Sequence, residues 1–362
     1  MKSILTVVGT RPEAIKMLPI CAALKKNPLF NNKICVTGQH TDLLKTFLNT
    51  REIKPDYHFA TLAESSSLHQ MAAHFLREFE TIFSGDKPDL ILVQGDTTSA
   101  FIGALSAFYS HISIGHIEAG LRTRNLLSPW PEEGHRSLID RLATYFFPPT
   151  EEAKHNLLLE GIPPERIWVV GNTSIDAIRQ MEELHTPKKT VNRNRVVVTI
   201  HRRENHGNRL KDVCFALLEL AKEFPKLEIV CLLHPNPNVR EPLTQSLGNM
   251  KNITLKEPMD HASFIQLLKE SHFVITDSGG IQEEASFIGT PVLIIRENTE
   301  RPEGVERETA RLVGTKPESL IASCRELLEN EQQLAEMRKV HSPYGDGHAA
   351  DRIVDILSNE LK

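Results

Sequence analysis

The sequence predicts an α/β protein made of two doubly wound, Rossmann-like domains. Short apolar runs rich in β-branched residues alternate with longer segments of helical periodicity, as in parallel sheets covered by helices. The same alternation restarts after residue 194, and a chain of 362 residues is long enough for two domains. Apolar residues make up 40% and charged residues 25% of the chain, which is ordinary for a globular protein.

The apolar runs give the expected strands in order. In the first half they are Ile4–Val8, Ile34–Thr37, Leu90–Gln94, Ser113–His116, Tyr145–Phe147 and Trp168–Val170. In the second half they are Arg195–Ile200, Glu228–Leu233, Ile253–Leu255, Phe273–Thr276 and Val292–Ile295. Helices are expected in the gaps, and the final one follows from the helical spacing of Ile353, Val354, Ile356 and Leu357.

The segment Leu184–Asn194 is polar and basic, contains a proline and has no periodicity, so it predicts an exposed linker that acts as a hinge. We therefore expect an N-terminal domain over residues 1–185 and a C-terminal domain over residues 195–345. The helix within residues 346–362 is expected to pack back toward the N-terminal domain.

Composition excludes several classes of protein. The 42 basic and 47 acidic residues give a net charge of -5, which argues against a protein that coats nucleic acid or an anionic membrane. Apolar runs such as Ile229–Leu233 are far shorter than the ~18 residues of a membrane span, and the first run ends too early for a signal peptide. The five scattered cysteines indicate reduced thiols and a cytoplasmic location, and the sixteen histidines form no metal-binding motif.

Two expected helix starts could hold an anion. After the first strand, Arg11 and Lys16 flank a turn at Gly9 and a helix N-terminus, a combination that favours a diphosphate; a solvated arginine and a surface lysine are the alternative.

The second helix start follows Thr276, where Ser278, Gly279 and Gly280 would let the backbone approach a phosphate and Glu284 could accept two ribose hydroxyls. The alternative is a serine cap with glycine in the turn. G-x-G-x-x-G is absent from the chain, so a nicotinamide cofactor is not expected.

Acidic residues follow consecutive elements of the first domain. Asp96 follows the run that ends at Gln94, Glu118 follows the next strand, and Glu132 begins an expected helix. Parallel strands bring their carboxyl ends to one edge, so these carboxylates should converge, and their mutual repulsion suits proton transfer near neutral pH. The alternative is that Asp96 caps a helix and Glu132 interacts with a helix dipole.

Basic residues follow strands of the second domain. His201 and Arg202 follow the first of them and could hold a departing diphosphate. His234 follows the next strand, where a structural role is an equal alternative. Arg301 lies in a charged segment after a later strand and could bind an anion or backbone carbonyls; a solvated run of charges is the alternative. Phe264 could stack on a base or belong to the core.

Nine strings of residues resemble the non-hydrolysing UDP-N-acetylglucosamine 2-epimerases: GTRPEAIKM, QGDTTS, HIEAGLRT, SPWPEE, HRREN, HPNPNVREP, TDSGGIQEEA, TERPEG and SPYGDG. They occur in order over nearly the whole chain. The resemblance implies a glycosyltransferase-B fold, two Rossmann-like domains facing across a cleft that holds the UDP-sugar. It also implies interconversion of UDP-GlcNAc and UDP-ManNAc without a cofactor or metal, by elimination of UDP to 2-acetamidoglucal and re-addition.

The resemblance also implies roles for individual residues. Asp96, Glu118 and Glu132 match the acid/base carboxylates, and His201 matches the histidine that supports the leaving diphosphate. Which carboxylate serves which face of C2 stays open. The UDP-contacting positions are matched by Arg11, Lys16, Phe264, Ser278, Gly279, Gly280, Glu284 and Arg301.

Bacterial members of that family bind a second UDP-GlcNAc as an allosteric activator, and they form homodimers. Gln39, Glu133, Arg202 and His234 resemble the activator site, whereas Asp42 stands where the family has a second glutamine. Three alternatives to an epimerase remain: an enzyme that hydrolyses UDP-GlcNAc to ManNAc and UDP, a glycosyltransferase, and a non-catalytic UDP-sugar sensor. The intact SPWPEE and TERPEG strings favour the epimerase over the hydrolysing enzyme. The three carboxylates argue against a glycosyltransferase, and together with His201 they argue against a sensor.

Overall fold

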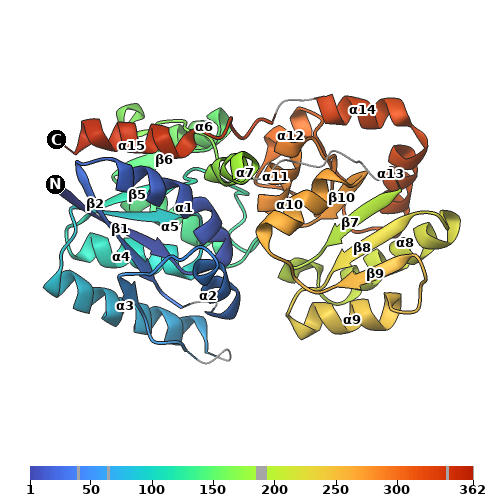
Figure 1. Ribbon diagram of the computed structural model, residues 1–362, viewed down its shortest axis with the longest axis horizontal. Coiled ribbons are helices and arrows are strands. Elements are labelled where there is room, and N and C mark those ends of the chain that lie inside the picture. The colour runs from blue at the N-terminus through green and yellow to red at the C-terminus, as the bar shows by residue number, and fades with distance from the viewer. Residues whose placement is uncertain (39–40, 63–65, 185–193, 340–341, 362) are drawn as a thin grey trace. The chain divides into compact units, whose positions relative to one another are not determined.

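The computed structural model describes residues 1–38, 41–62, 66–184, 194–339 and 342–361, and it forms two compact units (Figure 1). Unit 1 comprises Met1–Arg179 and Tyr344–Lys362, and unit 2 comprises Gln180–Pro343. The chain therefore leaves unit 1 within a helix and returns to it near its C-terminus. The predicted linker lies largely outside the described residues.

Unit 1 contains a six-stranded sheet in the order β3-β2-β1-β4-β5-β6, in which all the neighbouring strands run parallel. Its strands are β1 (Lys2–Val8), β2 (Phe30–Val36), β3 (Tyr57–His58), β4 (Leu90–Gln94), β5 (Ser113–Ile117) and β6 (Tyr145–Phe147). Its helices are α1 (Arg11–Lys26), α2 (Thr41–Asn49), α3 (Leu68–Gly85), α4 (Thr98–Tyr109), α5 (Glu132–Leu142), α6 (Glu151–Leu159), η1 (Pro164–Arg166), α7 (Thr173–Leu184, which crosses into unit 2) and α15 (Ala349–Glu360).

Alternate residues of β1 belong to two apolar cores. Ile4 and Val8 are buried in one core with residues of α1 and α15, whereas Leu5 and Val7 are buried in another with residues of α3 and α4. Successive residues of a strand point to opposite faces of its sheet, so helices cover both faces. This is the doubly wound arrangement that the apolar runs predicted.

Unit 2 repeats this topology with the strand order β12-β11-β10-β7-β8-β9. Its strands are β7 (Arg195–Thr199), β8 (Glu228–Leu232), β9 (Ile253–Lys256), β10 (Phe273–Thr276), β11 (Val292–Ile294) and β12 (Ala310–Leu312). Its helices are η2 (Arg203–Asn205), α8 (Asn208–Glu223), α9 (Pro237–Leu247), α10 (His261–Lys269), α11 (Gly279–Ile288), α12 (Pro302–Glu306), α13 (Pro317–Glu329) and α14 (Glu331–Lys339).

One predicted strand is wrong, and two strands were missed. Trp168–Val170 forms no strand, although the backbone N–H of Trp168 donates to the carbonyl of Phe146 at 3.0 Å; the pairing with β6 is an isolated bridge at Ile167. The apolar run arises because the Trp168 ring packs on Phe147. The strands β3 and β12 are only two and three residues long and carry polar residues, so no apolar pattern marked them.

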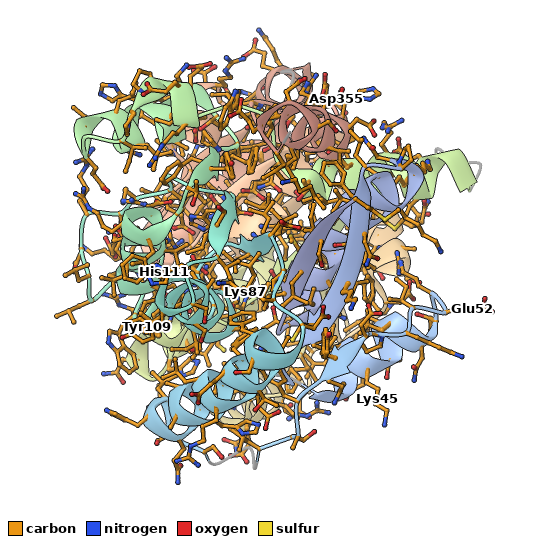
Figure 2. The ribbon with its side chains drawn as sticks, turned by 90° about the vertical axis from the view of Figure 1, so that its left-hand side faces the viewer. Lys45, Glu52, Lys87, Tyr109, His111 and Asp355 are labelled. Atoms are coloured by element: carbon orange, nitrogen blue, oxygen red, sulfur yellow. The ribbon has the colours of Figure 1, made fainter. Side chains whose placement is uncertain are left out.

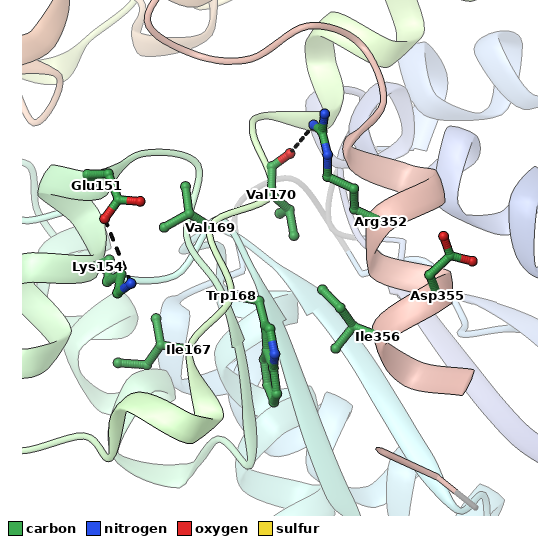
Figure 3. A pocket seen from close by; sticks show the side chains of 9 residues that line it. All are labelled: Glu151, Lys154, Ile167, Trp168, Val169, Val170, Arg352, Asp355 and Ile356. Atoms are coloured by element: carbon green, nitrogen blue, oxygen red, sulfur yellow. Dashed lines mark hydrogen bonds and ion pairs between the residues drawn. The ribbon is translucent and has the colours of Figure 1, made fainter. Parts of the chain in front are cut away.

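The surface of unit 1 includes exposed aromatic residues at the end of α4. Tyr109 is 66% exposed, and Figure 2 shows it near His111, where the helix gives way to the turn before β5. His111 has a φ of 54°, in the left-handed region. A shallow groove lies between the segment that contains Trp168 and helix α15, with Lys154 and Arg352 among its lining residues (Figure 3). None of the described candidate site residues lines it.

No helix among the described residues is long and apolar enough to span a membrane. The five cysteines are free and buried.

Candidate active site

Each unit has a topological switch point, where connections from two neighbouring central strands leave in opposite directions. In unit 1 this point lies between β1 and β4, and in unit 2 it lies between β7 and β10. Open parallel sheets bind their ligands outside the carboxyl ends of the strands at such points. Most of the candidate residues lie at or near these strand ends.

Glu118 follows β5 and is the most heavily coordinated of the candidate carboxylates. Its Oε2 accepts hydrogen bonds from Gln94 Nε2 at 2.7 Å and Asn172 Nδ2 at 3.2 Å, and it forms an ion pair with Lys16 Nζ. Glu118 is 8% exposed and has a φ of 67°, which directs the chain away from the strand direction. Lys16 is therefore a buried partner of a carboxylate and not a surface lysine.

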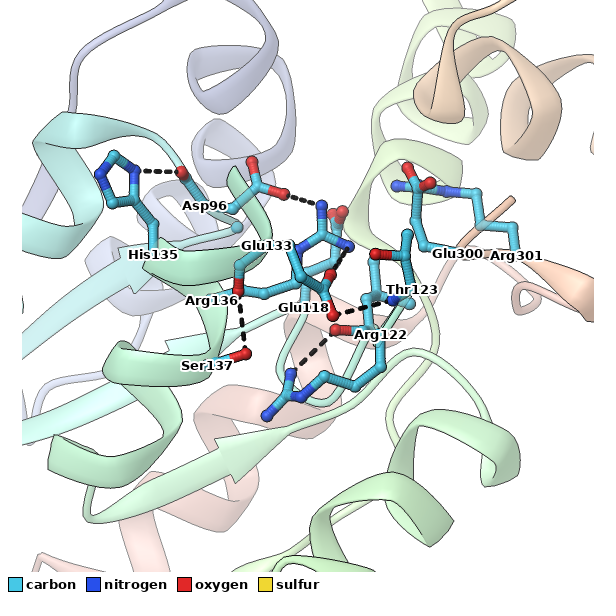
Figure 4. Close-up of polar contacts among 12 residues, drawn as sticks. Asp96, Glu118, Arg122, Thr123, Glu133, His135, Arg136, Ser137, Glu300 and Arg301 are labelled. Atoms are coloured by element: carbon cyan, nitrogen blue, oxygen red, sulfur yellow. Dashed lines mark hydrogen bonds and ion pairs between the residues drawn. The ribbon is translucent and has the colours of Figure 1, made fainter. Parts of the chain in front are cut away.

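Asp96 lies beside Glu118 because the strands that precede them are neighbours. The backbone N–H of Gly95 donates to the carbonyl of Ile117 at 3.0 Å, which joins the two strand ends. The Asp96 carboxylate accepts a hydrogen bond from Arg136 of α5, and Figure 4 shows the two side chains pointing toward each other. Its side chain keeps 27% exposure, so Asp96 is paired and still open to solvent.

Glu132 and Glu133 open helix α5 but have different environments. Glu132 is half-buried at the first helical position, where the helix dipole favours a carboxylate. Glu133 is 1% exposed, and its Oε1 accepts the backbone N–H groups of Thr123 and Arg124 at 2.9 and 2.8 Å (Figure 4). Glu133 therefore supports the loop before α5, in which Arg124 has a φ of 61°.

A buried network of polar and charged side chains holds the ends of β4 and β5 in place. His116 Nδ1 lies 2.6 Å from Asp140 Oδ1, and His116 Nε2 lies 2.9 Å from the carbonyl oxygen of Gly95. Both ring nitrogens face acceptors, which a doubly protonated imidazole satisfies. Burial alone would raise the pKa of Asp140, but His116 and Arg122 outweigh it and hold that pKa below its ordinary value.

The first turn of α1, which follows β1, carries a buried carboxylate that was not among the residues predicted from the sequence. Glu13 is 1% exposed; its Oε2 accepts hydrogen bonds from Gly9 N at 3.1 Å and Thr10 Oγ1 at 2.8 Å, and its Oε1 accepts one from Thr97 Oγ1 at 2.8 Å. Burial raises the pKa of Glu13 to about 7, although these hydrogen bonds lower it in part. Glu13 joins the loop before Arg11, the first residue of α1, to the loop that contains Asp96.

In unit 2, His201 and Arg202 follow β7. His201 Nδ1 lies 3.0 Å from Asp277 Oδ1, and the His201 side chain is 33% exposed. The rings of His201 and His234 are stacked with centroids 6.0 Å apart. Arg202 lies 3.7 Å from Glu300, measured between Nη2 and Oε1. The structure thus brings together His201, Arg202 and His234 at one edge of the second sheet.

The residues Ser278, Gly279 and Gly280 form the start of α11, with Ser278 as the N-cap. Within the described residues the Ser278 side chain accepts no capping hydrogen bond, so the first turn keeps backbone N–H groups for an acceptor such as a phosphate. Gly279 lies against Arg301, since a Cβ there would come within 2.2 Å of Arg301 Nη1.

Arg301 is 4% exposed and paired with Glu283 at 2.5 Å and Glu300 at 2.6 Å. It is therefore not a solvated charge.

The remaining candidates that the structure describes, Glu284 and Phe264, are both buried. Glu284 is 7% exposed and its Oε1 lies 2.8 Å from His261 Nε2. Phe264 is 9% exposed on α10, as a core residue would be. Gln39 lies outside the described residues. No three of the histidine, cysteine and acidic side chains in the described part of the chain are grouped as a metal site requires.

Several residues that hold the candidate side chains had no signal in the sequence. Gln94 and Asp277 lie within the family-like strings QGDTTS and TDSGGIQEEA, but the residues they contact are distant in the chain. Asn172 lies outside all of these strings and 54 positions from its partner Glu118. Glu283 and Glu300 were likewise missed as partners of Arg301. Such pairings depend on which strands are neighbours, and local periodicity does not specify this.

A family model and proteins of known structure match this chain over nearly its whole length. The family model described as UDP-N-acetylglucosamine 2-epimerase matches residues 22–358. The protein of that name from Escherichia coli (strain K12) is 42% identical over 369 aligned residues, which cover 98% of each chain. The crystal structure of UDP-GlcNAc 2-epimerase from Neisseria meningitidis bound to UDP-GlcNAc has a TM-score of 0.92 and 42% identity, and covers 99% of this chain and 100% of that one. The Methanocaldococcus jannaschii UDP-GlcNAc 2-epimerase in complex with UDP-GlcNAc and UDP has a TM-score of 0.88 and 34% identity, with 99% of each chain covered.

Proposed function

This chain belongs to the UDP-N-acetylglucosamine 2-epimerase family, and on that premise we propose that it interconverts UDP-GlcNAc and UDP-ManNAc through the residues described above. A general base removes the proton from C2 of the sugar. The C1–O bond then breaks, its electron pair leaves with UDP, and 2-acetamidoglucal remains. Protonation of C2 on the opposite face and return of UDP complete the reaction.

The observation that carries this proposal is the pair of carboxylates at the ends of neighbouring strands, each held by a buried cation. Asp96 is paired with Arg136, and Glu118 is paired with Lys16. Each cation fixes the position of its carboxylate before substrate binds, as a group that exchanges a proton with C2 requires. The two carboxylates are thus paired with cations, and not set against each other as the sequence led us to expect. Glu132, at the first turn of α5, is the third carboxylate of the proposed set.

Unit 2 supplies the groups that we assign to the nucleotide. The first turn of α11 and Arg301 would receive the diphosphate, and Glu284 would accept hydrogen bonds from the ribose hydroxyls. His201 would stabilise the charge that develops on the leaving UDP. No metal or redox cofactor is part of this proposal.

The remaining assignments rest on the family resemblance. We propose that the chain works as a homodimer in the cytoplasm; light scattering tests the oligomeric state. The exposed apolar side chains of Phe108 and Tyr109 on α4 and Leu138 on α5 are available for such an interface. An allosteric site would include Arg202 and His234, whereas the burial of Glu133 favours a structural role for that residue.

The decisive experiment is to incubate the purified protein with UDP-GlcNAc in D2O, without added metal or nicotinamide cofactor, and to follow the sugar by proton NMR. Formation of UDP-ManNAc with deuterium at C2 is the expected result. Free ManNAc and UDP would indicate the hydrolysing alternative, which the names of the relatives do not favour. Unchanged substrate despite measurable binding would indicate a sensor or a transferase.

The carboxylate assignment is tested by Asp96→Asn, Glu118→Gln and Glu132→Gln. Each is expected to lower turnover at least ~100-fold while the fold survives, because general acid/base groups contribute roughly 10²- to 10⁴-fold. Glu80→Gln, at an exposed position on α3, is the matched control and should keep normal turnover. Near-normal turnover in all three site variants would overturn the assignment.

A further inference from the structure

Asp277 is a buried acidic residue of the TDSGG string to which the proposed reaction gives no role. It follows β10 directly, it is 0% exposed, and the N-cap of α11 is the next residue. Its position is the switch point of the second sheet, since β10 lies beside β7 with Thr276 opposite Thr199. A buried carboxylate needs several donors to stay ionised, so its partners indicate its purpose.

The partners of Asp277 come from the segment that carries His201. The carboxylate accepts the backbone N–H of His201 at 3.1 Å and that of Arg202 at 3.0 Å, and it accepts a hydrogen bond from Asn205 Nδ2 at 2.9 Å. Its Oδ1 also lies 3.0 Å from His201 Nδ1. Burial would raise the pKa of Asp277, but the charge of His201 and these hydrogen bonds outweigh it and hold that pKa well below its usual range.

This arrangement determines the proton on the His201 ring. An ionised carboxylate can only accept, so Nδ1 of His201 must carry a hydrogen. The ring is held through Nδ1 and one third of the side chain is exposed, so Nε2 is the nitrogen left to meet a ligand. The same residue also fixes the distance between His201 and the first turn of α11, because Ser278 follows Asp277 in the chain.

We propose that Asp277 is a positioning residue for the reaction: it orients His201, fixes the hydrogen on Nδ1, and stabilises the imidazolium that faces the departing diphosphate. This inference rests on the proposed function of His201. When the C1–O bond breaks and its electron pair stays on the UDP oxygen, a protonated Nε2 donates a hydrogen bond to the diphosphate. Asp277 balances the positive charge of the ring but does not touch the substrate.

The test is a double-mutant cycle with Asp277→Asn and His201→Ala. Asparagine keeps the size of the side chain but offers no carboxylate, so kcat is expected to fall by about 10- to 100-fold while KM changes less than ~3-fold. When His201 is already alanine, Asp277→Asn should lower kcat by less than another ~2-fold, because the imidazole ring that Asp277 orients is absent. A fall in kcat of the same size in both backgrounds would overturn the proposal.

Two further measurements separate positioning from loss of fold and from failure of the proposed function. Asn205→Ala removes another hydrogen bond to Asp277 without touching the His201 ring, so it should lower Tm but retain kcat within ~3-fold. Nitrogen-15 NMR of the His201 ring, assigned with His201→Ala, should show hydrogen on Nδ1 in the wild type. The protonation of the two His201 ring nitrogens should change in Asp277→Asn. Unchanged nitrogen shifts in that variant would refute the inference even if the protein had no epimerase activity.

Discussion

The buried carboxylate of Glu13 makes a specific prediction about stability and pH. Replacing Glu13 with glutamine keeps the size of the side chain and removes its charge. The glutamine oxygen can still accept from Gly9 N and Thr10 Oγ1, and its amide group can donate to Thr97 Oγ1. The substitution therefore isolates the cost of an ionised group in this site, where burial raises the pKa of Glu13 from 4.5 to about 7.

The raised pKa fixes both the sign and the size of the effect. The folded protein binds this proton more tightly than the unfolded chain, so the contribution of Glu13 to stability is complete below pH 4.5 and is lost as the pH rises through 7. The two pKa values differ by about 2.5, which corresponds to about 3 kcal/mol at ~1.4 kcal/mol for each pH unit. Between pH 5 and pH 8 we expect about 2.5 kcal/mol of this change.

The assay is differential scanning calorimetry of the wild type and Glu13→Gln at several pH values between 5 and 8, which measures how the difference in their stability changes with pH. The Tm of the variant should rise relative to that of the wild type by on the order of 3–6 °C across this range, with most of the change between pH 5 and pH 7 and little above pH 7. Glu80→Gln, at an exposed position on α3, should show no such trend. A difference between variant and wild type that stays constant with pH would refute the reasoning, because it would mean that Glu13 does not titrate in this window.

Two further predictions concern buried ion pairs and hydrogen bonds. Gly279→Ala should lower the free energy of unfolding by about 2–4 kcal/mol, since a Cβ there would lie 2.2 Å from Arg301 Nη1 and disturb its buried ion pairs. Gly280→Ala, where a Cβ would meet no described atom within 4 Å, is the matched control in urea unfolding; an equal loss there would exclude the contact with Arg301 as the cause. Glu133→Ala should lower the free energy of unfolding by at least ~2 kcal/mol in urea, because it leaves the N–H groups of Thr123 and Arg124 without their acceptor. A normal Tm together with altered activation by UDP-GlcNAc would instead favour an allosteric role for Glu133.

The sequence determined the class of fold because each of its signals is local. Strand residues such as Ile4 and Leu5 are buried on opposite faces of a sheet, and parallel strands buried on both sides need apolar runs that are visible without a structure. The ends of β4 and β10 were predicted at the observed residues. The location of Asp96 just beyond a strand followed from this, because parallel strands deliver their following loops to one edge.

The tertiary structure decided which charges face one another. Lys16 and Glu118 are 102 positions apart, and His201 and Asp277 are 76 positions apart. His201 and Asp277 meet because they follow the neighbouring strands β7 and β10, whereas Lys16 of α1 reaches Glu118 across the end of β4, which lies between β1 and β5. The sequence could place Lys16 near an anion but could not identify the protein carboxylate that neutralises it. An ion pair of this kind depends on strand order and side-chain burial, and both are properties of the folded chain as a whole.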